Sequence, residues 1–462
     1  MKLNQGLASS LYWGSEKLQG RGNVVTRLRW LEGTQYLSSR ECRKLQMDKL
    51  HALLVHAYES VPYYSRVFRE RGLVPDDFSS LTDLSKLPLL TRKELTEHQA
   101  DLISTRADRA TLQTNYSSGS TGTRACFVQD ANFRLWMRAH QLRTYQWCAG
   151  WKVGEPFALL WGSSIYWNLK SVSDRLKNLM SNRREFNTFR LSPELISEFT
   201  RSLADFNPVL ISTYTNAMHL VARQMERESI RVPALRAIQG TSEPLPPIIR
   251  ERLQRVFNCE VYDKYGSRET NIVSHESPCH DGMLIQVENV AEEFLNDDGA
   301  ACQPGETGRV VLTTLNNFAM PLIRYETSDL AAPLTGCCAS GLGLPRMSHV
   351  TGRQQDLIVT PNGAYIDAYL FSFLIMRFEE VEWFQVVQDS LERLRIRLMT
   401  PAGIARQRCD EIVERIHHHT GYPFRIEFEQ LDRMPDSPTG KFRLCVSAFS
   451  DIGTSSPAVV SP

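Results

Sequence analysis

Short apolar runs alternate with helical patterns through the middle of the chain. The apolar runs are residues 157–162, 209–214, 235–240 and 260–266, and apolar positions recur at helical spacing over residues 131–149, 193–204, 216–228 and 246–257. Such alternation with short connections is typical of a largely parallel sheet with helices on both faces. The pattern therefore predicts an α/β fold whose functional residues follow the carboxyl ends of the strands.

The two ends of the chain have different patterns. Residues 1–100 are predicted to be mostly helical, and beyond residue 352 the order strand, helix, strand, strand, helix, strand predicts a small α+β domain. We therefore expect a large N-terminal domain over residues 1–352, with mixed and parallel sheets flanked by helices, and a small mobile C-terminal domain over residues 353–450. Residues 451–462 are rich in Ser and Pro and are expected to be disordered.

Composition narrows the classes of function. The 462 residues are too many for one compact core, and the net charge of +1 gives no support for nucleic acid as a partner. The sequence contains no run of about 18 apolar residues and no signal-peptide pattern, so we expect no membrane insertion. Most of the ten cysteines stand singly, which is typical of reduced thiols in a cytoplasmic protein.

A run of small hydroxyl and glycine residues separates two short predicted strands. Residues 117–124 read Ser-Ser-Gly-Ser-Thr-Gly-Thr-Arg, and the flanking residues 111–114 and 125–128 favour a hairpin. Glycines let the backbone approach a ligand, and successive N–H groups and hydroxyls can surround an anion. The run predicts a phosphate-binding loop, with a flexible loop that binds nothing as the alternative.

Further candidate residues follow the predicted strands. Glu243 comes shortly after one strand, and Tyr265, Gly266 and Glu269 come at the end of the next. An aromatic ring, a glycine and a carboxylate can supply a stacking surface, close backbone approach and a Mg²⁺ ligand beside a triphosphate. For Glu269 the alternative is a solvated surface carboxylate. The candidates for a substrate pocket at other strand ends are Trp161, Tyr214, Thr215 and Gly240.

These motifs, in this order over residues 45–445, resemble the adenylate-forming superfamily of acyl-CoA synthetases and ligases. The branch that the chain resembles most is the phenylacetate–CoA ligase-like branch, including the CapK-type proteins. The remaining motifs are Tyr325-Glu326-Thr327-Ser328-Asp329, Gly352-Arg353 at the predicted hinge and Thr439-Gly440-Lys441 near the end of the small domain.

The resemblance implies an AMP-forming acid–thiol ligase that uses ATP and Mg²⁺. It would activate an aryl or acyl carboxylic acid as an acyl-adenylate and transfer the acyl group to CoA. Glu269 would hold Mg²⁺, and Arg353 and Lys441 would assist catalysis. The nucleotide-binding residues that it implies are Ser117, Ser118, Gly119, Ser120, Thr121, Gly122, Glu243, Tyr265, Gly266, Asp329 and Arg353.

Two departures from the family's pattern bear on these roles. Thr123 stands where the phosphate loop normally carries Lys, and Gln355 stands where the hinge residue is usually Asp or Lys. Full domain rotation is therefore an open question. An adenylating synthetase that acylates an amine, a sugar or a carrier-protein thiol fits the same residues. A non-catalytic relative is disfavoured by the presence of Glu269, Asp329, Arg353 and Lys441. The acid and the oligomeric state stay open, a homodimer being one option.

CapK-like proteins often carry a structural zinc, so we considered whether this chain does. The usual spacing is not kept, because Ser277 and Ser340 stand where cysteines would be expected. Ordinary thiols and surface histidines are therefore preferred to a zinc site. The residues that would bind the ion are Cys279, His280, Cys337 and Cys338.

Overall fold

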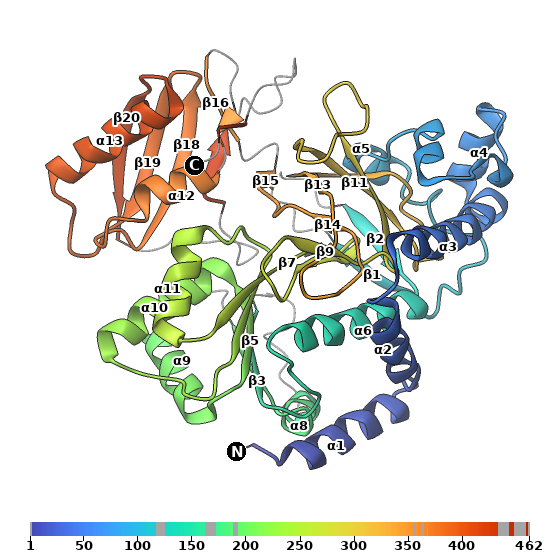
Figure 1. Cartoon of the computed structure of the whole chain (residues 1–462), viewed down its shortest axis with the longest axis horizontal. Coiled ribbons are helices and arrows are strands. Elements are labelled where there is room, and N and C mark those ends of the chain that lie inside the picture. The colour runs from blue at the N-terminus through green and yellow to red at the C-terminus, as the bar shows by residue number, and fades with distance from the viewer. Residues whose placement is uncertain are drawn as a thin grey trace.

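The computed structural model describes residues 2–116, 125–161, 172–187, 193–353, 357–361, 365–366, 368–432, 443–447 and 459–460. Figure 1 shows a large part that contains the N-terminus and a smaller C-terminal part beside helices α10 and α11. The described residues contain no helix with the length and apolar character needed to cross a membrane.

The first hundred residues are mostly helical, as predicted. Helix α3 begins with a capping box in which Ser38 and Glu41 bond each other's backbone, and Pro62 occupies the first turn of α4, where its missing N–H costs nothing. Apolar residues of these helices pack against the hairpin β1–β2 and the strands that follow residue 290. The elements are α1 (Gln5–Leu18), α2 (Asn23–Thr34), α3 (Ser39–Ser60), α4 (Pro62–Glu70), η1 (Pro75–Asp77), η2 (Leu81–Lys86) and α5 (Arg92–Glu97).

Within the described residues, the largest sheet has nine strands in the order β13-β14-β9-β8-β7-β6-β5-β3-β4. Strands β4, β3, β5, β6 and β7 are parallel, and the pairs beyond β7 are antiparallel. The predicted α/β fold with a mixed sheet is therefore confirmed. The strands are β3 (Phe157–Trp161), β4 (Arg183–Asn187), β5 (Leu210–Tyr214), β6 (Ala237–Thr241), β7 (Glu260–Ser267), β8 (Asn271–Glu276), β9 (Met283–Ile285), β13 (Pro333–Leu334) and β14 (Arg346–Met347).

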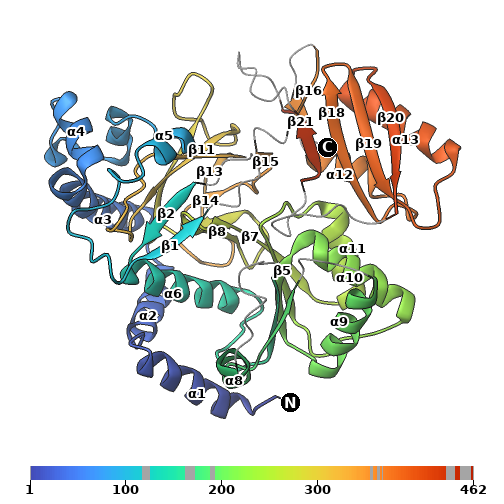
Figure 2. The ribbon, with the colours of Figure 1, turned by 180° about the vertical axis from the view of Figure 1, so that it is seen from behind.

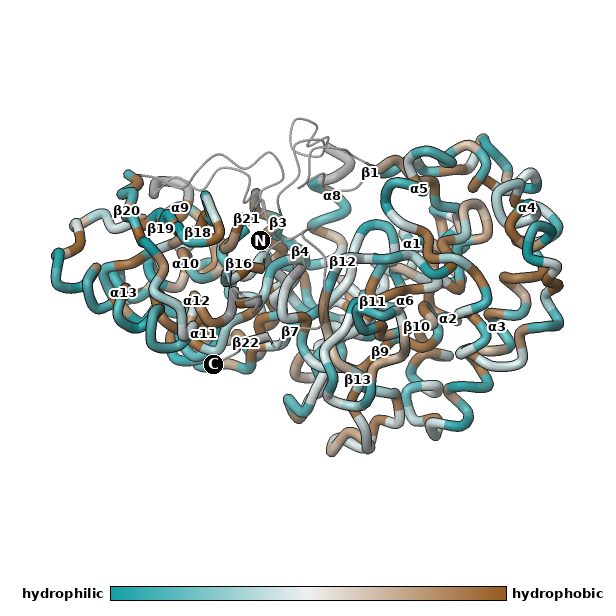
Figure 3. The backbone as a smooth tube through the Cα atoms, turned by 90° about the horizontal axis from the view of Figure 1, so that it is seen from above, coloured by the Kyte–Doolittle hydropathy of each residue, from teal (hydrophilic) through white to brown (hydrophobic). Residues whose placement is uncertain are grey.

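Helices cover both faces of this sheet. Apolar residues of α9, α10 and α11 pack on one face, and those of α1, α2 and α6 pack with the strands on the other. Figure 3 shows brown, hydrophobic stretches along the interior strands, whereas the outer helix α13 is largely teal. The helices are α6 (Ala131–Trp147), α8 (Val172–Met180), α9 (Pro193–Phe206), α10 (Thr215–Glu228) and α11 (Pro247–Phe257).

Two smaller antiparallel units complete the large part. The hairpin β1–β2 flanks the Ser/Gly run, with Tyr116 opposite Cys126, so the predicted hairpin is confirmed. A second sheet has the order β10-β11-β12-β15. Its strands and those of the hairpin are β1 (Gln113–Tyr116), β2 (Cys126–Gln129), β10 (Val290–Leu295), β11 (Gly308–Thr314), β12 (Tyr325–Ala331) and β15 (Gly352–Arg353).

The C-terminal part has the predicted order of elements. Its sheet, β20-β19-β18-β21, carries α12 and α13, and is visible in orange and red in Figure 2. Val459 and Val460 pair with β17, inside the stretch expected to be disordered. The elements are β16 (Ile358–Val359), β17 (Tyr365–Ile366), α12 (Ala368–Ile375), β18 (Trp383–Ser390), β19 (Arg393–Met399), α13 (Arg406–Thr420), β20 (Arg425–Leu431), β21 (Cys445–Ser447) and β22 (Val459–Val460).

Arginines of α10 and α11 hold the C-terminal part against the large part. Arg223 donates to the carbonyls of Glu379 and Val381 at 2.7 and 2.8 Å, and Arg252 forms an ion pair with Glu379 at 2.7 Å. Apolar residues from both parts belong to one buried cluster. The domain limits 1–352 and 353–450 stay a prediction.

Candidate active site

The ends of the parallel strands bring the predicted pocket residues together. Trp161 ends β3 and Tyr214 ends β5, and their ring centroids lie 4.9 Å apart. Tyr214 is buried, whereas Trp161 is 39% exposed. The two rings therefore form an aromatic wall that solvent reaches from the Trp161 side.

Thr215, Gly240 and Glu243 lie close together at the start of α10, which follows Tyr214 directly. A Cβ atom on Gly240 would lie 3.2 Å from Thr215 Oγ1, so a larger residue there would crowd the start of α10. Glu243 is buried, and its Oε2 accepts a 3.0 Å hydrogen bond from the Asn216 N–H in the first turn of α10. A carboxylate at a helix N-terminus satisfies an otherwise unpaired donor and complements the helix dipole. Glu243 thus holds the segment that follows β6 against the start of α10.

The stretch after Tyr265 is the turn of a hairpin, because β7 continues directly into antiparallel β8. The strand register shifts between Tyr265 and Gly266, and a Cβ on Gly266 would lie 2.3 Å from the carbonyl oxygen of Asn271. Gly266 is therefore required by the packing of the hairpin itself. The nucleotide-binding role predicted for Gly266 stays a prediction.

Glu269 lies in this turn and is 9% exposed. The hydrogen bond from the Thr270 N–H to Ser267 Oγ, 3.1 Å long, closes the turn around it. Across the part of the chain that the structure describes, the Glu269 carboxylate forms neither a hydrogen bond nor an ion pair. Burial of a carboxylate is costly unless a partner compensates its charge, and oxygen ligands suit Mg²⁺. Glu269 thus fits the predicted Mg²⁺ ligand better than it fits a solvated surface carboxylate.

Tyr265 joins the β7–β8 hairpin to the second sheet. Its phenol donates a 2.7 Å hydrogen bond to Asp329 Oδ2. Asp329 is 7% exposed and lies opposite Arg353 in the pairing of β12 with β15. Three predicted site residues, separate in the sequence, therefore meet at one place. Only the backbone of Arg353 belongs to the described structure.

The hairpin β1–β2 lies beside this turn, as Figure 2 shows. The Gln129 amide accepts from Asn115 at 2.8 Å and donates to the Arg268 carbonyl at 2.7 Å. Arg268 Nη1 donates to the carbonyl of Tyr116, the residue that precedes the Ser/Gly run, at 3.5 Å. The stem of the predicted phosphate loop therefore lies next to the turn with Glu269. The residues of the notable motifs that lie outside the described residues are Ser117, Ser118, Gly119, Ser120, Thr121, Gly122, Thr123, Gln355 and Lys441.

The zinc candidates do not gather around one point. Cys279 and Cys337 are exposed, and His280 bonds Glu260 and Glu276 at 3.0 and 3.1 Å. Cys338 donates instead to Asp281 Oδ1 at 3.3 Å. No group of three or more His, Cys, Asp or Glu residues in the described ranges could hold a metal ion.

Asp281 is the centre of this hydrogen-bonded cluster. Ser277 donates to its Oδ1, the Ala339 N–H donates to its Oδ2 at 2.8 Å, and Arg346 forms an ion pair with it at 2.8 Å. Cys338 and Ser340 also bond each other at 2.8 Å. The two serines that replace the expected cysteines are thus partners in a network of protein groups.

Sequence patterns did not reveal a charged group around His349, which contacts Asp263 of β7. His349 bonds Asp263 at 3.2 Å and lies 3.5 Å from Glu276. Burial opposes the charged form, but the hydrogen bonds to Asp263 and Glu276 outweigh it and raise the pKa of His349 to about 9. Burial likewise disfavours the charged Glu276, yet hydrogen bonds from His280 and His349 lower its pKa. These residues are far apart in the sequence, so no local motif marks them.

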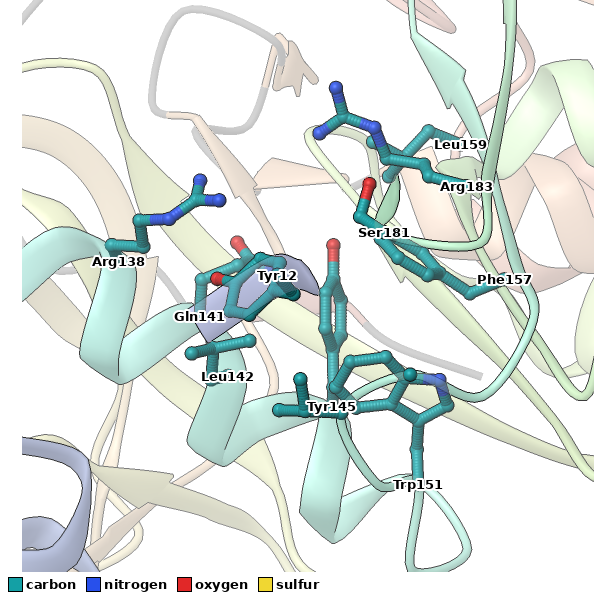
Figure 4. Close-up of a pocket in the computed structure, with 12 residues that line it drawn as sticks. Tyr12, Arg138, Gln141, Leu142, Tyr145, Trp151, Phe157, Leu159, Ser181 and Arg183 are labelled. Carbon is teal, nitrogen blue, oxygen red and sulfur yellow. The ribbon is translucent and has the colours of Figure 1, made fainter. Parts of the chain in front are cut away.

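A small cavity lies away from these strand ends, between α1, α6 and β3 (Figure 4). It holds about 70 Å³, which is room for a few water molecules but not for an aryl acid. Its lining includes Gln141 and Trp151, whose side-chain nitrogens have no partner among the described residues. Such polar atoms suit buried water, so we assign the cavity no part in catalysis. The other residues that line it are Tyr12, Arg138, Leu142, Tyr145, Val153, Gly154, Phe157, Leu159, Ser181 and Arg183.

The chain is similar to several known proteins. Residues 358–448 match the family model of the CapK C-terminal domain. The chain is 26% identical over 338 residues to phenylacetate-coenzyme A ligase of Aromatoleum evansii, covering 71% of this chain and 74% of that protein. It is 21% identical over 421 residues to Protein CapK of Staphylococcus aureus, covering 88% of this chain and 90% of that protein.

A solved structure shares the fold. 2-Hydroxyisobutyryl-CoA ligase, in the postadenylation state in complex with R3-HIB-AMP, superposes with a TM-score of 0.74 at 19% identity, covering 89% of this chain and 90% of that chain. The chain therefore shares the fold of this acyl-CoA ligase. In sequence it is similar to phenylacetate-coenzyme A ligases and to Protein CapK, and the resemblance predicted from the sequence is thereby confirmed.

Proposed function

We propose that the protein is an AMP-forming acid–thiol ligase that activates an aryl or acyl carboxylic acid with ATP and transfers the acyl group to CoA. The observation that carries this proposal is the convergence at Tyr265. This residue bonds Asp329 and belongs to the hairpin whose turn holds Glu269 and contacts the stem of the Ser/Gly run. The similarity to phenylacetate-coenzyme A ligases supports the choice of CoA as acceptor.

The reaction has two steps. In the first, a carboxylate oxygen of the acid attacks the α-phosphorus of ATP, the bond to the bridging oxygen breaks and pyrophosphate leaves. In the second, the CoA sulfur attacks the acyl carbon, the thiol gives up its proton and AMP leaves. The first step brings a negative carboxylate to a negative phosphate, so positive groups must offset the developing charge.

Each site residue has its own role in this reaction. Asp329 accepts hydrogen bonds from the ribose hydroxyls, and the Tyr265 ring lies beside the adenine. The aromatic wall of Trp161 and Tyr214 contacts the acyl group. Glu269 would hold Mg²⁺, which would neutralise phosphate charge when bound. Arg353 and Lys441 add positive charge from the hinge and the small domain, and Ser117 to Gly122 surround the phosphates.

We place this activity in the cytoplasm. All ten cysteines lie in the described part of the chain and are free thiols, which is typical of a reducing compartment. Two of them, Cys337 and Cys279, are exposed without having formed disulfides.

The test is pyrophosphate exchange into ATP with a panel of aryl and aliphatic acids, followed by addition of CoA, amines, sugars or a carrier protein. We expect exchange that requires one class of acid and Mg²⁺, and acyl-CoA as product. Transfer to an amine, a sugar or a carrier protein but not to CoA would replace the ligase by an adenylating synthetase. If the protein neither exchanges pyrophosphate into ATP nor binds ATP in calorimetry, the proposal that it is an ATP-dependent enzyme is refuted.

A further inference from the structure

Helix α1 packs on the rest of the protein through one face. Ala8, Tyr12 and Glu16 are buried on this face. Glu16 forms an ion pair with Arg138 of α6 at 2.9 Å, and the Arg138 guanidinium lies 5.2 Å from the centroid of the Tyr12 ring. These contacts account for the apolar and charged residues on the inner side of the helix, but not for those on its outer side.

The outer face of α1 is apolar although it is exposed. Leu7, Leu11 and Leu18 are 52%, 37% and 91% exposed, and their spacing places them with Gly14 in one stripe along the helix. A Cβ atom on Gly14 would lie within 4 Å of no other atom of the described residues apart from its own helix backbone and chain neighbours. Leu176 of the neighbouring helix α8 is 54% exposed. An apolar surface of this kind marks a contact with another apolar body.

The start of α1 is fixed to the large part of the protein. The Leu3 N–H donates to Asn182 Oδ1 at 2.7 Å, and Asn182 Nδ2 donates to the Leu3 carbonyl at 2.9 Å. A Cβ atom on Gly154 would lie 2.3 Å from the Gln5 carbonyl oxygen, so the chain before β3 approaches the helix as closely as only glycine allows. Figures 1 and 2 both show α1 along one edge of the molecule. The leucine stripe is therefore held at this edge by an anchored helix.

The charge near the leucine stripe is positive. Glu16 is 2% exposed and is paired on the inner face, so its carboxylate does not reach the stripe. It is the single acidic residue in residues 1–31, whose basic residues are Lys2, Lys17, Arg21, Arg27 and Arg29. The sequence of α8 adds Arg175 and Lys177 to one acidic residue, Asp174. Leucines combined with basic residues complement a surface that is apolar beneath a layer of negative charge, which describes an anionic lipid bilayer.

We propose that α1 lies on the surface of an anionic lipid membrane. Its leucine stripe contacts the boundary between headgroups and acyl chains, and the exposed Lys2 and Lys17 contact the headgroups. The cytoplasmic leaflet of a membrane carries lipids of this charge. A second copy of the chain suits the stripe less well, because a two-fold dimer would bring the same basic face against itself with no exposed acidic residue of α1 to meet it.

This contact leaves the candidate active site open to solution. Helix α1 covers the amino ends of β3 and β4, because Tyr12 lines the small cavity together with Phe157 and Arg183, the first residues of those strands. Trp161 and Tyr214 lie at the carboxyl ends of the parallel strands. The membrane would therefore lie beyond the opposite end of the strands from the candidate site. The inference goes beyond the proposed function and does not depend on it.

The experiment is flotation of the full chain with vesicles of phosphatidylcholine, alone or mixed with phosphatidylglycerol. One variant, Leu7→Ser/Leu11→Ser/Leu18→Ser, removes the apolar stripe. The other, Lys2→Gln/Lys17→Gln, removes two positive charges and leaves the leucines in place. Because all five side chains are exposed, the substitutions leave the buried packing intact, which melting curves of each variant check.

The matched control is Val74→Ser/Phe373→Ser, which removes exposed apolar side chains of similar size on other elements. Val74 is 45% exposed and Phe373 is 39% exposed. We expect this variant to bind vesicles as wild type does. A loss of binding in the control equal to that of the triple variant would show that general surface apolarity, and not the stripe on α1, causes binding, and would overturn the proposal.

We expect wild-type protein to float with the anionic vesicles and not with phosphatidylcholine alone, and high salt to weaken the binding by screening. The triple serine variant should bind anionic vesicles roughly ten- to hundredfold more weakly, because the apolar contact is lost. The double glutamine variant should lose roughly fivefold for each lysine.

Three further results would overturn the proposal. One is wild-type protein that does not bind anionic vesicles. Another is binding that is equally tight to both kinds of vesicle or unchanged in the triple serine variant. The third comes from light scattering without lipid: a wild-type dimer that becomes a monomer in the triple serine variant would assign the stripe to a second copy of the chain. None of these results bears on pyrophosphate exchange, so the proposed function is tested separately.

Discussion

The Tyr265 phenol donates a 2.7 Å hydrogen bond to Asp329 Oδ2, although 64 residues separate the two in the sequence. The backbone of Asp329 is also held within its own strand, because its N–H donates a 3.2 Å hydrogen bond to Thr327 Oγ1. A carboxylate held in this way has fixed lone pairs for the two hydroxyls of a ribose. The bond therefore links the aromatic residue proposed at the adenine to the residue proposed at the sugar.

Asp329→Asn should weaken the binding of both AMP and ATP by roughly ten- to hundredfold, because an amide replaces an acceptor-only group. Tyr265→Phe keeps the ring and loses only the bond to Asp329, so its effect should be a few-fold. Calorimetry with AMP measures both effects. Tyr262→Phe serves as control, since Tyr262 belongs to β7 but packs with the cluster on the other face of the sheet. Unchanged AMP affinity in Asp329→Asn would place the ribose elsewhere.

Glu269→Gln should raise the Mg²⁺ concentration needed for half-maximal exchange by tenfold or more, because a neutral amide is a much poorer ligand for a hard cation. Circular dichroism should show an intact fold, since Glu269 has no bond to lose among the described residues. Glu260→Gln, at the start of β7, the strand that precedes this turn, is the control. A wild-type Mg²⁺ dependence in Glu269→Gln would mean that the ligand is another residue.

Local patterns predicted β3, β5, β6 and β7 of the large sheet because short apolar runs mark them, but they did not predict β4, whose residues 183–187 are mostly polar. The run ending at Trp161 and the run ending at Tyr214 are both buried strands, as expected. The pairing of Tyr265 with Asp329 required the family's motifs, because no spacing in the sequence places β7 beside β12.

Local sequence patterns did not predict other features of the structure. Gly266 is required by a close approach to Asn271, which depends on the register shift of the hairpin. The fully buried ion pair of Arg143 with Glu288 joins α6 to the segment before β10. Arg and Glu are usually found at the surface, so neither residue by itself indicates a buried position. Contacts of this kind form only in the tertiary structure, so the sequence around each partner carries no sign of them.

The cluster at Asp281 predicts a protein without structural zinc. Asp281 accepts from Ser277 and Cys338, and the described residues contain no group of three or more His, Cys, Asp or Glu that could hold an ion. Elemental analysis of protein purified without chelator should therefore give substoichiometric zinc. Stoichiometric zinc that disappears in Cys338→Ser would contradict this and restore the zinc site. Asp281→Ala should lower stability by about 1–3 kcal/mol, because it leaves the Ala339 N–H unpaired and removes the carboxylate that forms an ion pair with Arg346.

Substitution of Lys441 tests the role of the small domain in catalysis. If this lysine contacts the substrate carboxylate and the α-phosphate only during adenylation, its removal lowers kcat and kcat/KM together. Lys441→Ala should therefore reduce exchange by about 10²–10³-fold or more with little change in ATP affinity. Thioester formation from a supplied acyl-adenylate should be nearly unaffected, because the domain has rotated by then. Equal loss in both half-reactions would indicate that the domain stays in one position, and Gln355 would then be the first residue to examine.

The stability of the folded protein should depend measurably on pH because of His349. Its imidazolium lies between Asp263 and Glu276, and Arg250 and His280 face Glu276 from the other side. The pKa of His349 in the folded protein is about 9, above the ordinary value of about 6.5. Since the folded state binds this proton more tightly, the stabilisation is complete below about pH 6.5 and is lost as the pH rises through about 9.

His349→Gln should therefore be less stable than wild type near pH 6.5, and the difference should shrink by pH 10. The side chain is 34% exposed, so solvent screening limits the effect to on the order of 1 kcal/mol, or roughly 1–2 °C in Tm. Calorimetric melting curves of both proteins across this range measure it. His419→Gln, on α13 and bonded to the Arg415 carbonyl, is the control. A difference that stays constant or grows with pH would show that His349 is neutral in the folded protein and contributes by packing alone.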